Sequence, residues 1–363
     1  MTAASNRPPV PAPPIPLGIV EGYFGTPWSF ADRTVVMETL ADWGFSRFTY
    51  APKADRTLRL DWRQAHDEDT ARALIAFAAR CREVGVSFGI GLSPYGLHQS
   101  MDADGRAALE RRVRELTALG ASRIAIFFDD MRGDIPDLAA RQAEIASWAS
   151  AALDGAPLDV CPSYYSDDPV LDRVFGARPE GYERALGEAL DARHSIYWTG
   201  PEVCAAEITP AHAARVGEEF ARKPVLWDNY PVNDGPRMSR RLHLAGISGR
   251  RGLAPHLDAH DLNPALQPHL SLLPCATLAI CYRDGDDYDY RAATAEAAHA
   301  LYPEALAKDI LETRLPLQDG GIEFVDRAKV RARFEKHDHP AAREMIRFAN
   351  GAYQQTADDI ETQ

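Results

Sequence analysis

Two adjacent carboxylates follow a short apolar segment of the chain. In the sequence IAIFFDD, residues 124–130, five apolar residues lead directly into Asp129 and Asp130. An unbroken apolar run is typical of a parallel strand covered on both faces. Two close carboxyl groups do not ionise independently, so one keeps its proton while the other is charged. An acid beside a charged partner is the arrangement that glycosidases use. The alternative is a solvated turn or helix cap with no chemical role.

Other residues able to bind a ligand also stand where apolar segments end. They are Glu21 to Gly25, Lys53, Tyr165, Trp198 to Pro201, Trp227 to Asn229, and Asn263. Flat aromatic rings pack on the C–H faces of sugars, and carboxylates and amides fix hydroxyl groups. The set therefore indicates a carbohydrate site, although each residue taken alone also fits an ordinary core or surface position.

The elements that would carry these residues alternate regularly. Eight strand-like segments occur, most of them followed by a helical pattern, and Ser29 is a candidate N-cap of the first helix. The segments are 17–25, 47–53, 86–94, 123–130, 158–165, 194–201, 224–234 and 257–264. Eight such repeats favour an α/β fold of the (β/α)8 TIM barrel type, in which the carboxyl ends of the strands meet at one pocket. A doubly wound sheet is the alternative, but no GxGxxG follows the first strand.

The sequence divides into three parts. Residues 8–16 contain six prolines, so residues 1–16 are expected to form a proline-rich extension. Residues 17–303 would form the barrel. Residues 304–363 show helical patterns without strands and would form a small helical C-terminal appendage.

Composition limits the partners and the compartment. The net charge is −13 without a long Lys/Arg run, which disfavours nucleic acid and anionic membranes. Five cysteines without a CxxC pair are expected to be reduced thiols. No signal peptide and no 18-residue apolar stretch is evident, so a soluble cytoplasmic protein is expected. His256, His260 and His269 lack a ligand pattern, so we expect no metal and no cofactor.

Seven motifs in order resemble glycoside hydrolase family 84, the O-GlcNAcase and β-N-acetylglucosaminidase family. They cover roughly residues 17–302: GIVEGYFGTPW (18–28), YAPKAD with DWR (50–55 and 61–63), FFDDM (127–131), CPSYY (161–165), YWTGPEV (197–203), LWDNYPVND (226–234) and LNP (262–264). Each motif alone is weak, whereas the ordered set is specific.

The resemblance implies a retaining exo-β-N-acetylglucosaminidase that cleaves through an oxazoline formed by the substrate's own acetamido group. Asp129 would orient that group, and Asp130 would be the general acid and then the base. The substrate-binding residues implied are Gly22, Lys53, Cys161, Tyr165, Trp227, Asn229, Asp234 and Asn263. The partner would be a GlcNAc-bearing glycoprotein or glycoconjugate, and a homodimer is possible.

Two positions depart from the family pattern, and other functions stay open. Phe24 replaces a usual tyrosine, and Tyr164 stands where an acid is common, so altered pocket polarity or aglycone preference is expected. The alternatives are a hexosaminidase for hyaluronan-like, peptidoglycan or chitooligosaccharide substrates, a GlcNAc-binding protein without catalysis, and a metal-dependent hydrolase using Asp129, Asp130 and Asp228.

Overall fold

A closed barrel of eight parallel strands forms the centre of the molecule, as predicted. The computed structural model describes residues 12–360, so most of the proline-rich extension lies outside the described residues. The strands pair in chain order, and β1 closes the barrel against β8 with Leu17 opposite His260. They are β1 Leu17–Val20, β2 Phe45–Tyr50, β3 Ser87–Leu92, β4 Arg123–Phe127, β5 Asp159–Cys161, β6 Ser195–Trp198, β7 Val225–Asp228 and β8 Ala259–Leu262.

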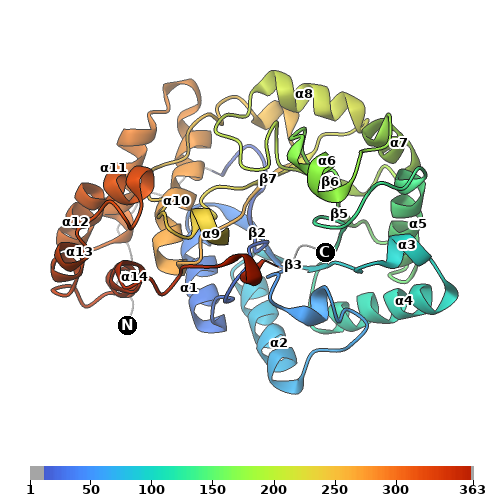
Figure 1. The fold of residues 1–363 in the computed structure, drawn as a ribbon, viewed down its shortest axis with the longest axis horizontal. Coiled ribbons are helices and arrows are strands. Elements are labelled where there is room, and N and C mark those ends of the chain that lie inside the picture. Colours follow the sequence, from blue (N-terminus) through green and yellow to red (C-terminus); the bar gives the residue numbers. More distant parts are fainter. Residues whose placement is uncertain (1–11, 361–363) are drawn as a thin grey trace.

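Helices surround this barrel (Figure 1). They are α1 Phe30–Ala41, α2 Glu68–Glu83, α3 Leu97–Ser100, α4 Ala103–Ala118, α5 Leu138–Ala151, α6 Val170–Phe175, α7 Tyr182–Ala189, α8 Pro210–Glu219, α9 Gly235–Met238, α10 Pro268–Asp284 and α11 Tyr290–Leu301. Ser29 caps α1 as predicted, because its hydroxyl accepts a hydrogen bond from the Asp32 backbone N–H at 3.0 Å. The short helices α3, α6 and α9 lie in loops where the sequence shows no helical period.

A charged cluster fills the barrel interior near the amino ends of the strands. We call it the interior layer; it consists of Arg47, Arg123, Asp159, Tyr197 and Asp261. Arg47 binds both Asp159 and Asp261 at 3.2 Å, and the Tyr197 hydroxyl donates to Asp261 at 2.8 Å. TIM barrels more often fill this space with branched apolar residues.

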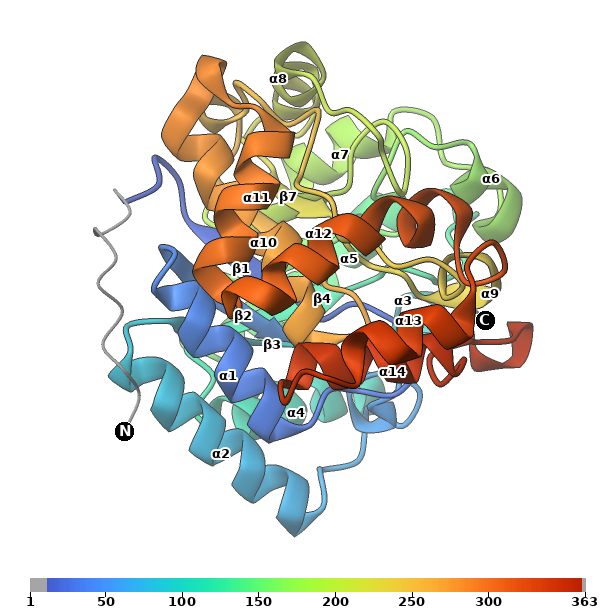
Figure 2. The same cartoon turned by 90° about the vertical axis from the view of Figure 1, so that its left-hand side faces the viewer.

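Three further helices follow the barrel: α12 Glu304–Leu315, α13 Arg327–Phe334 and α14 Pro340–Ala349. Figure 2 shows them on the side of the barrel that α10 and α11 cover. After α14 the chain crosses back toward α9, at the centre of Figure 1. The division at residue 303 stays a prediction. Among residues 12–360, no helix is long and apolar enough to cross a membrane.

Candidate active site

The backbone after β4 turns both acidic side chains toward one cavity. The strand ends at Phe127, and Asp130 adopts a left-handed conformation with φ 56°. Residues other than glycine rarely adopt this conformation, and aspartate is among those that tolerate it. Because side chains alternate along a straight strand, adjacent residues would point to opposite faces. The turn at Asp130 therefore explains how two neighbours serve the same cavity.

The cavity at the carboxyl ends of the strands has a volume of about 210 Å³, and we call it the acid cavity. Nine of the ten predicted site residues line it: Gly22, Asp129, Asp130, Cys161, Tyr165, Trp227, Asn229, Asp234 and Asn263. The tenth, Lys53, is buried beneath it and binds both acids. A larger cavity of about 540 Å³ lies on the outer side of the loop that follows β1.

Lys53 contacts both members of the acid pair. Its ammonium group donates a short hydrogen bond to Asp129 and lies 3.3 Å from an Asp130 oxygen. The Asp129 side chain is 7% exposed, and its Oδ1 has no hydrogen-bond partner among the described residues. Burial raises the pKa of Asp129, the Lys53 charge opposes this, and the charge of Asp130 adds to it. The free Oδ1 is thus an acceptor ready for a ligand donor.

Tyr165 orients the second acid. Its hydroxyl donates to Asp130 Oδ1 at 3.0 Å. Burial raises the pKa of Tyr165 well above its usual value, and the Asp130 charge adds to the effect, so the phenol keeps its proton. Burial likewise raises the pKa of Cys161, which makes this residue a neutral part of the wall rather than a thiolate nucleophile.

An amide network fixes the opposite side of the acid cavity. Asn229 Oδ1 accepts from the Trp227 indole N–H at 3.0 Å and from the Asn263 amide at 2.9 Å. Asn263 in turn accepts from the Gly22 backbone N–H at 3.1 Å. A Cβ atom at Gly22 would lie 1.9 Å from the Trp227 ring, so only glycine allows this close approach.

Asp234 lies at the edge of the acid cavity formed by the loops after β1 and β7. Its Oδ2 accepts a hydrogen bond from the Phe24 backbone N–H at 2.7 Å. Burial raises the pKa of Asp234 to about 6, against the opposing effect of this hydrogen bond. The Phe24 ring faces the cations of Lys53 and Arg59, at 5.9 and 6.0 Å from its centre. Phe24 therefore keeps a cation contact although it lacks the hydroxyl usual in the family.

Two acidic residues at strand ends do not face the acid cavity. This corrects the expectation that all polar residues at the carboxyl ends of the strands meet at one pocket. Glu21 is fully buried and accepts from Arg33 at 2.9 Å. Asp228 is 1% exposed and binds Arg250 at 2.8 Å and His260 at 3.1 Å. These partners hold the pKa of Asp228 well below its usual range despite its burial. Asp228 is thus committed to a buried ion pair.

The position of Asp228 also removes the proposed three-aspartate metal site. Among residues 12–360, no three His, Cys, Asp or Glu side chains are grouped to hold a metal ion. Tyr164 likewise points away from the acid cavity. Its hydroxyl donates to the Gly176 carbonyl at 2.7 Å, and its ring packs on Tyr182. Tyr164 is therefore not part of the cavity lining.

Sequence reasoning did not assign several residues that line the acid cavity. They are Val203, Cys204, Val232, Gly235 and Ile360, while Phe24 and Thr199 lay within the candidate ranges without a binding role of their own. Most lie inside or next to the recognised motifs, so their place in the chain could have indicated them. Ile360 is different, because it comes from the C-terminal segment, where no motif or period pointed to the site.

Comparisons with known proteins identify the family of the chain. A sequence model described as beta-N-acetylglucosaminidase matches residues 17–313. The protein O-GlcNAcases of Mus musculus and Rattus norvegicus are each 29% identical over 279 residues, which is 73% of this chain. The chain spans only 30% of the length of these two relatives.

A solved structure supports the fold. A variant of the Thermobaculum terrenum O-GlcNAc hydrolase superposes with a TM-score of 0.76 at 24% identity, covering 95% of this chain and 86% of the other. Because the family model covers most of the chain, and because the motif residues meet in one cavity, the chain belongs to the β-N-acetylglucosaminidase family, glycoside hydrolase family 84.

Proposed function

We propose that the protein is a retaining exo-β-N-acetylglucosaminidase that removes terminal β-linked GlcNAc, and that its substrates include O-GlcNAc-modified proteins. The observation that carries the proposal is the pairing of Asp129 and Asp130 at one cavity, with an unpaired Asp129 oxygen. The names of the two rodent relatives support the protein-bound substrate.

The acid pair accounts for substrate-assisted cleavage. Asp129 Oδ1 accepts the N–H of the substrate's 2-acetamido group and turns its carbonyl oxygen toward C1. That oxygen bonds to C1 as the C1–O1 bond breaks, and Asp130 gives its proton to the leaving oxygen. The resulting oxazoline carries positive charge, which the Asp129 carboxylate stabilises. Asp130 then takes a proton from the water whose oxygen attacks C1, the bond between C1 and the acetamido oxygen breaks to restore the amide, and the β-configuration is restored.

The remaining residues hold the sugar in this geometry. Trp227 and Cys161 form the wall of the space for the acetamido methyl group, and Tyr165 and Asn229 line the same cavity. Asn263, the Gly22 backbone and Asp234 take the ring hydroxyls, while Lys53 holds the two acids. A carboxylate, amides and an aromatic wall in one cavity match the chemistry of a sugar bearing an amide.

Hydrolysis of aryl β-N-acetylglucosaminides with good and poor leaving groups tests the proposal. Asp130→Asn should lose about 10²- to 10⁴-fold on poor leaving groups and much less on good ones, because a good leaving group needs no acid. Asp129→Asn should lose a similar factor on both, because oxazoline formation is then impaired. Asp134→Asn is the matched control, since this exposed aspartate lies in the same loop and, among the described residues, forms its ion pair with Arg132.

Two outcomes would contradict the proposal. Equal losses for Asp130→Asn on good and poor leaving groups would remove its acid role. Wild-type rates that do not fall when fluorine replaces hydrogen on the substrate's acetamido methyl group would exclude that group as the nucleophile, because fluorine weakens the attacking oxygen. Proton NMR of the first product anomer checks retention independently.

A further inference from the structure

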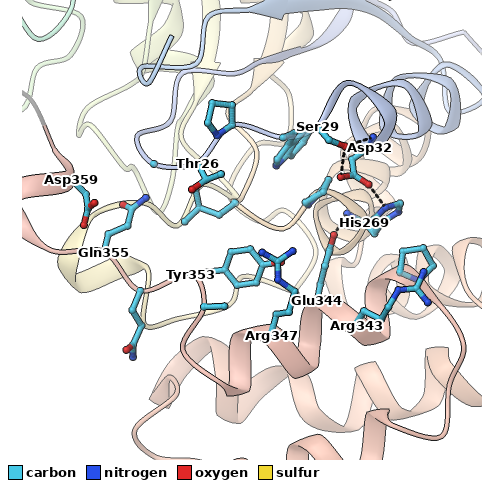
Figure 3. A pocket seen from close by; sticks show the side chains of 18 residues that line it. Thr26, Ser29, Asp32, His269, Arg343, Glu344, Arg347, Tyr353, Gln355 and Asp359 are labelled. Atoms are coloured by element: carbon cyan, nitrogen blue, oxygen red, sulfur yellow. Dashed lines mark hydrogen bonds and ion pairs between the residues drawn. The ribbon is translucent and has the colours of Figure 1, made fainter. Parts of the chain in front are cut away.

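The segment after α14 reaches the acid cavity from the far end of the chain. We call residues 351–360 the C-terminal strap. Ile360 lines the acid cavity, whereas Tyr353, Gln355 and Asp359 line the larger outer cavity. Figure 3 shows Gln355 at one end of that outer cavity, between Thr26 and Asp359. The strap therefore lies between the two cavities.

The Gln355 side chain joins two loops of the site. Its Nε2 donates to the Phe24 carbonyl at 2.8 Å, and its Oε1 accepts from the Gly235 backbone N–H at 2.5 Å. Phe24 belongs to the loop after β1, and Gly235 begins α9 after β7. Both ends of one amide group are thus used to hold the same two loops together.

These two loops are the ones that meet at Asp234. The Phe24 peptide donates its N–H to Asp234 Oδ2 at 2.7 Å, while its carbonyl accepts from Gln355. Gly235 follows Asp234 directly, and its N–H is held by the other end of the same Gln355 amide. The direction of the Asp234 carboxylate is therefore set through Gln355 from both sides.

The rest of the strap reinforces this position. The Gln355 backbone N–H donates to the Ser239 hydroxyl at 3.0 Å, at the end of α9. A Cβ atom at Gly235 would lie 3.1 Å from the tip of Ile360. At Gly25 a Cβ atom would lie 1.9 Å from Gln355 Nε2, so the loop after β1 also leaves space for this one side chain.

We infer that Gln355 is a positioning residue that holds Asp234 and, with Ile360, closes the end of the acid cavity at which the sugar's O4 and O6 lie. This rests on the proposed function, which places those hydroxyls at Asp234. The strap then sets the substrate class: a terminal GlcNAc with an equatorial, unsubstituted O4. A substituent at O4 would meet the strap before it reached the outer cavity.

The test compares Gln355→Ala with Gln354→Ala. Gln354 is the adjacent residue of the same type, it is exposed, and within residues 12–360 its side chain makes no hydrogen bond to the site loops. With aryl β-GlcNAc, Gln355→Ala should raise KM about 10-fold and change kcat less than about 2-fold, because the acid pair is untouched. The ratio of kcat/KM for aryl β-GlcNAc over its 4-epimer, aryl β-GalNAc, should fall about 10-fold. Gln354→Ala should stay within about 2-fold of wild type on both.

A double-mutant cycle separates positioning from general loosening of the fold. In an Asp234→Asn background, Gln355→Ala should change kcat/KM less than about 2-fold, because the residue it positions no longer carries a charge. A full 10-fold effect in that background would overturn the inference, as would an unchanged KM or an unchanged epimer ratio in the single variant.

Two further controls separate a loss of positioning from a loss of folding and from failure of the proposed function. Gln355→Glu retains the acceptor for Gly235 and removes the donor to Phe24, so it should raise KM. Melting temperatures show whether Gln355→Ala folds as well as the wild type; if it does not, the KM of Gln355→Glu decides the test. If the wild type turns over no glycoside, the proposed function fails. Calorimetric binding of free GlcNAc and GalNAc to the same variants then tests Gln355 alone: loss of GlcNAc preference supports its role, and unchanged preference overturns it.

Discussion

The barrel contains two buried groups of charges, one at each end, and they are built differently. In the interior layer two arginines meet two aspartates, so the charges balance. At the acid cavity Lys53 meets two aspartates, so the charges balance only while one carboxyl group keeps its proton. The interior layer satisfies Asp261 with Arg47 and Tyr197, whereas Asp129 Oδ1 has no partner among the described residues. The charges of the interior layer satisfy one another, whereas a group with an unpaired oxygen is free to act on a ligand.

The largest effect on stability is expected in the interior layer. Asp261→Asn leaves Arg47 and Arg123 with Asp159 alone, and an unpaired buried charge costs about 3–5 kcal/mol of unfolding free energy. Urea denaturation measures this loss, while kcat per folded molecule should stay within about 2-fold of wild type. Asp258→Asn, at an exposed position just before the same strand, should change stability by less than about 0.5 kcal/mol. A similar loss in both variants would remove the distinction between the two ends.

The opposite pattern is expected at the acid cavity. Asp129→Asn leaves Lys53 and Asp130 as a balanced pair 3.3 Å apart, so the free energy of unfolding should fall by less than about 1 kcal/mol or should rise. The raised pKa of Asp129 leads to the same expectation for stability, because it means that the charged carboxylate is disfavoured in the folded protein. Denaturation at pH 7 checks this, and a loss above about 3 kcal/mol would show that the acid pair is a stabilising element after all.

A smaller effect is expected in the pH dependence of Asp234. With a folded pKa of about 6, against an ordinary value of 3.8, Asp234 is protonated below pH 6 and ionised above it. The ionised form accepts sugar hydroxyls best, so kcat/KM should fall as the pH drops through about 6. Its contribution to stability runs the other way: it is full below pH 3.8 and is lost as the pH rises through 6.

Asp234→Asn should remove that acidic limb and raise KM at pH 7.5. The measurement is a kcat/KM profile from pH 4.5 to 8 for both proteins. If kcat/KM of the variant still falls below about pH 6, the fall arises from the acid pair, and the titration of Asp234 does not control activity.

Most of the fold follows from local patterns in the sequence. Eight apolar runs and the helical periods between them are enough to predict the barrel, because each βα unit is encoded within a short segment. The carboxyl ends of the strands then identify the site, which is why Asp129, Tyr165 and Asn263 could be named before the structure was known. The short helices α3, α6 and α9 were not predicted, because a helix of four to six residues shows no clear hydrophobic period.

Side-chain direction and long-range contacts could not be predicted in the same way. Glu21 and Asp228 lie at strand ends like the site residues, but each binds an arginine instead of facing the cavity. Glu21 binds Arg33 and Asp228 binds Arg250, and both arginines lie outside the recognised motifs. The Gln355 contact spans 331 residues to Phe24 and depends on how the C-terminal helices pack. Neither a period nor a motif encodes such a contact.

The left-handed backbone at Asp130 limits how this position can evolve or be redesigned. Aspartate and asparagine tolerate the conformation, whereas the other common acid, glutamate, would add backbone strain as well as an extra methylene. The environment of the Asp130 carboxylate is therefore best changed through the residues that contact it, Tyr165 and Lys53. Variant libraries that randomise these neighbours and keep Asp130 fixed would explore new leaving-group preferences without distorting the turn.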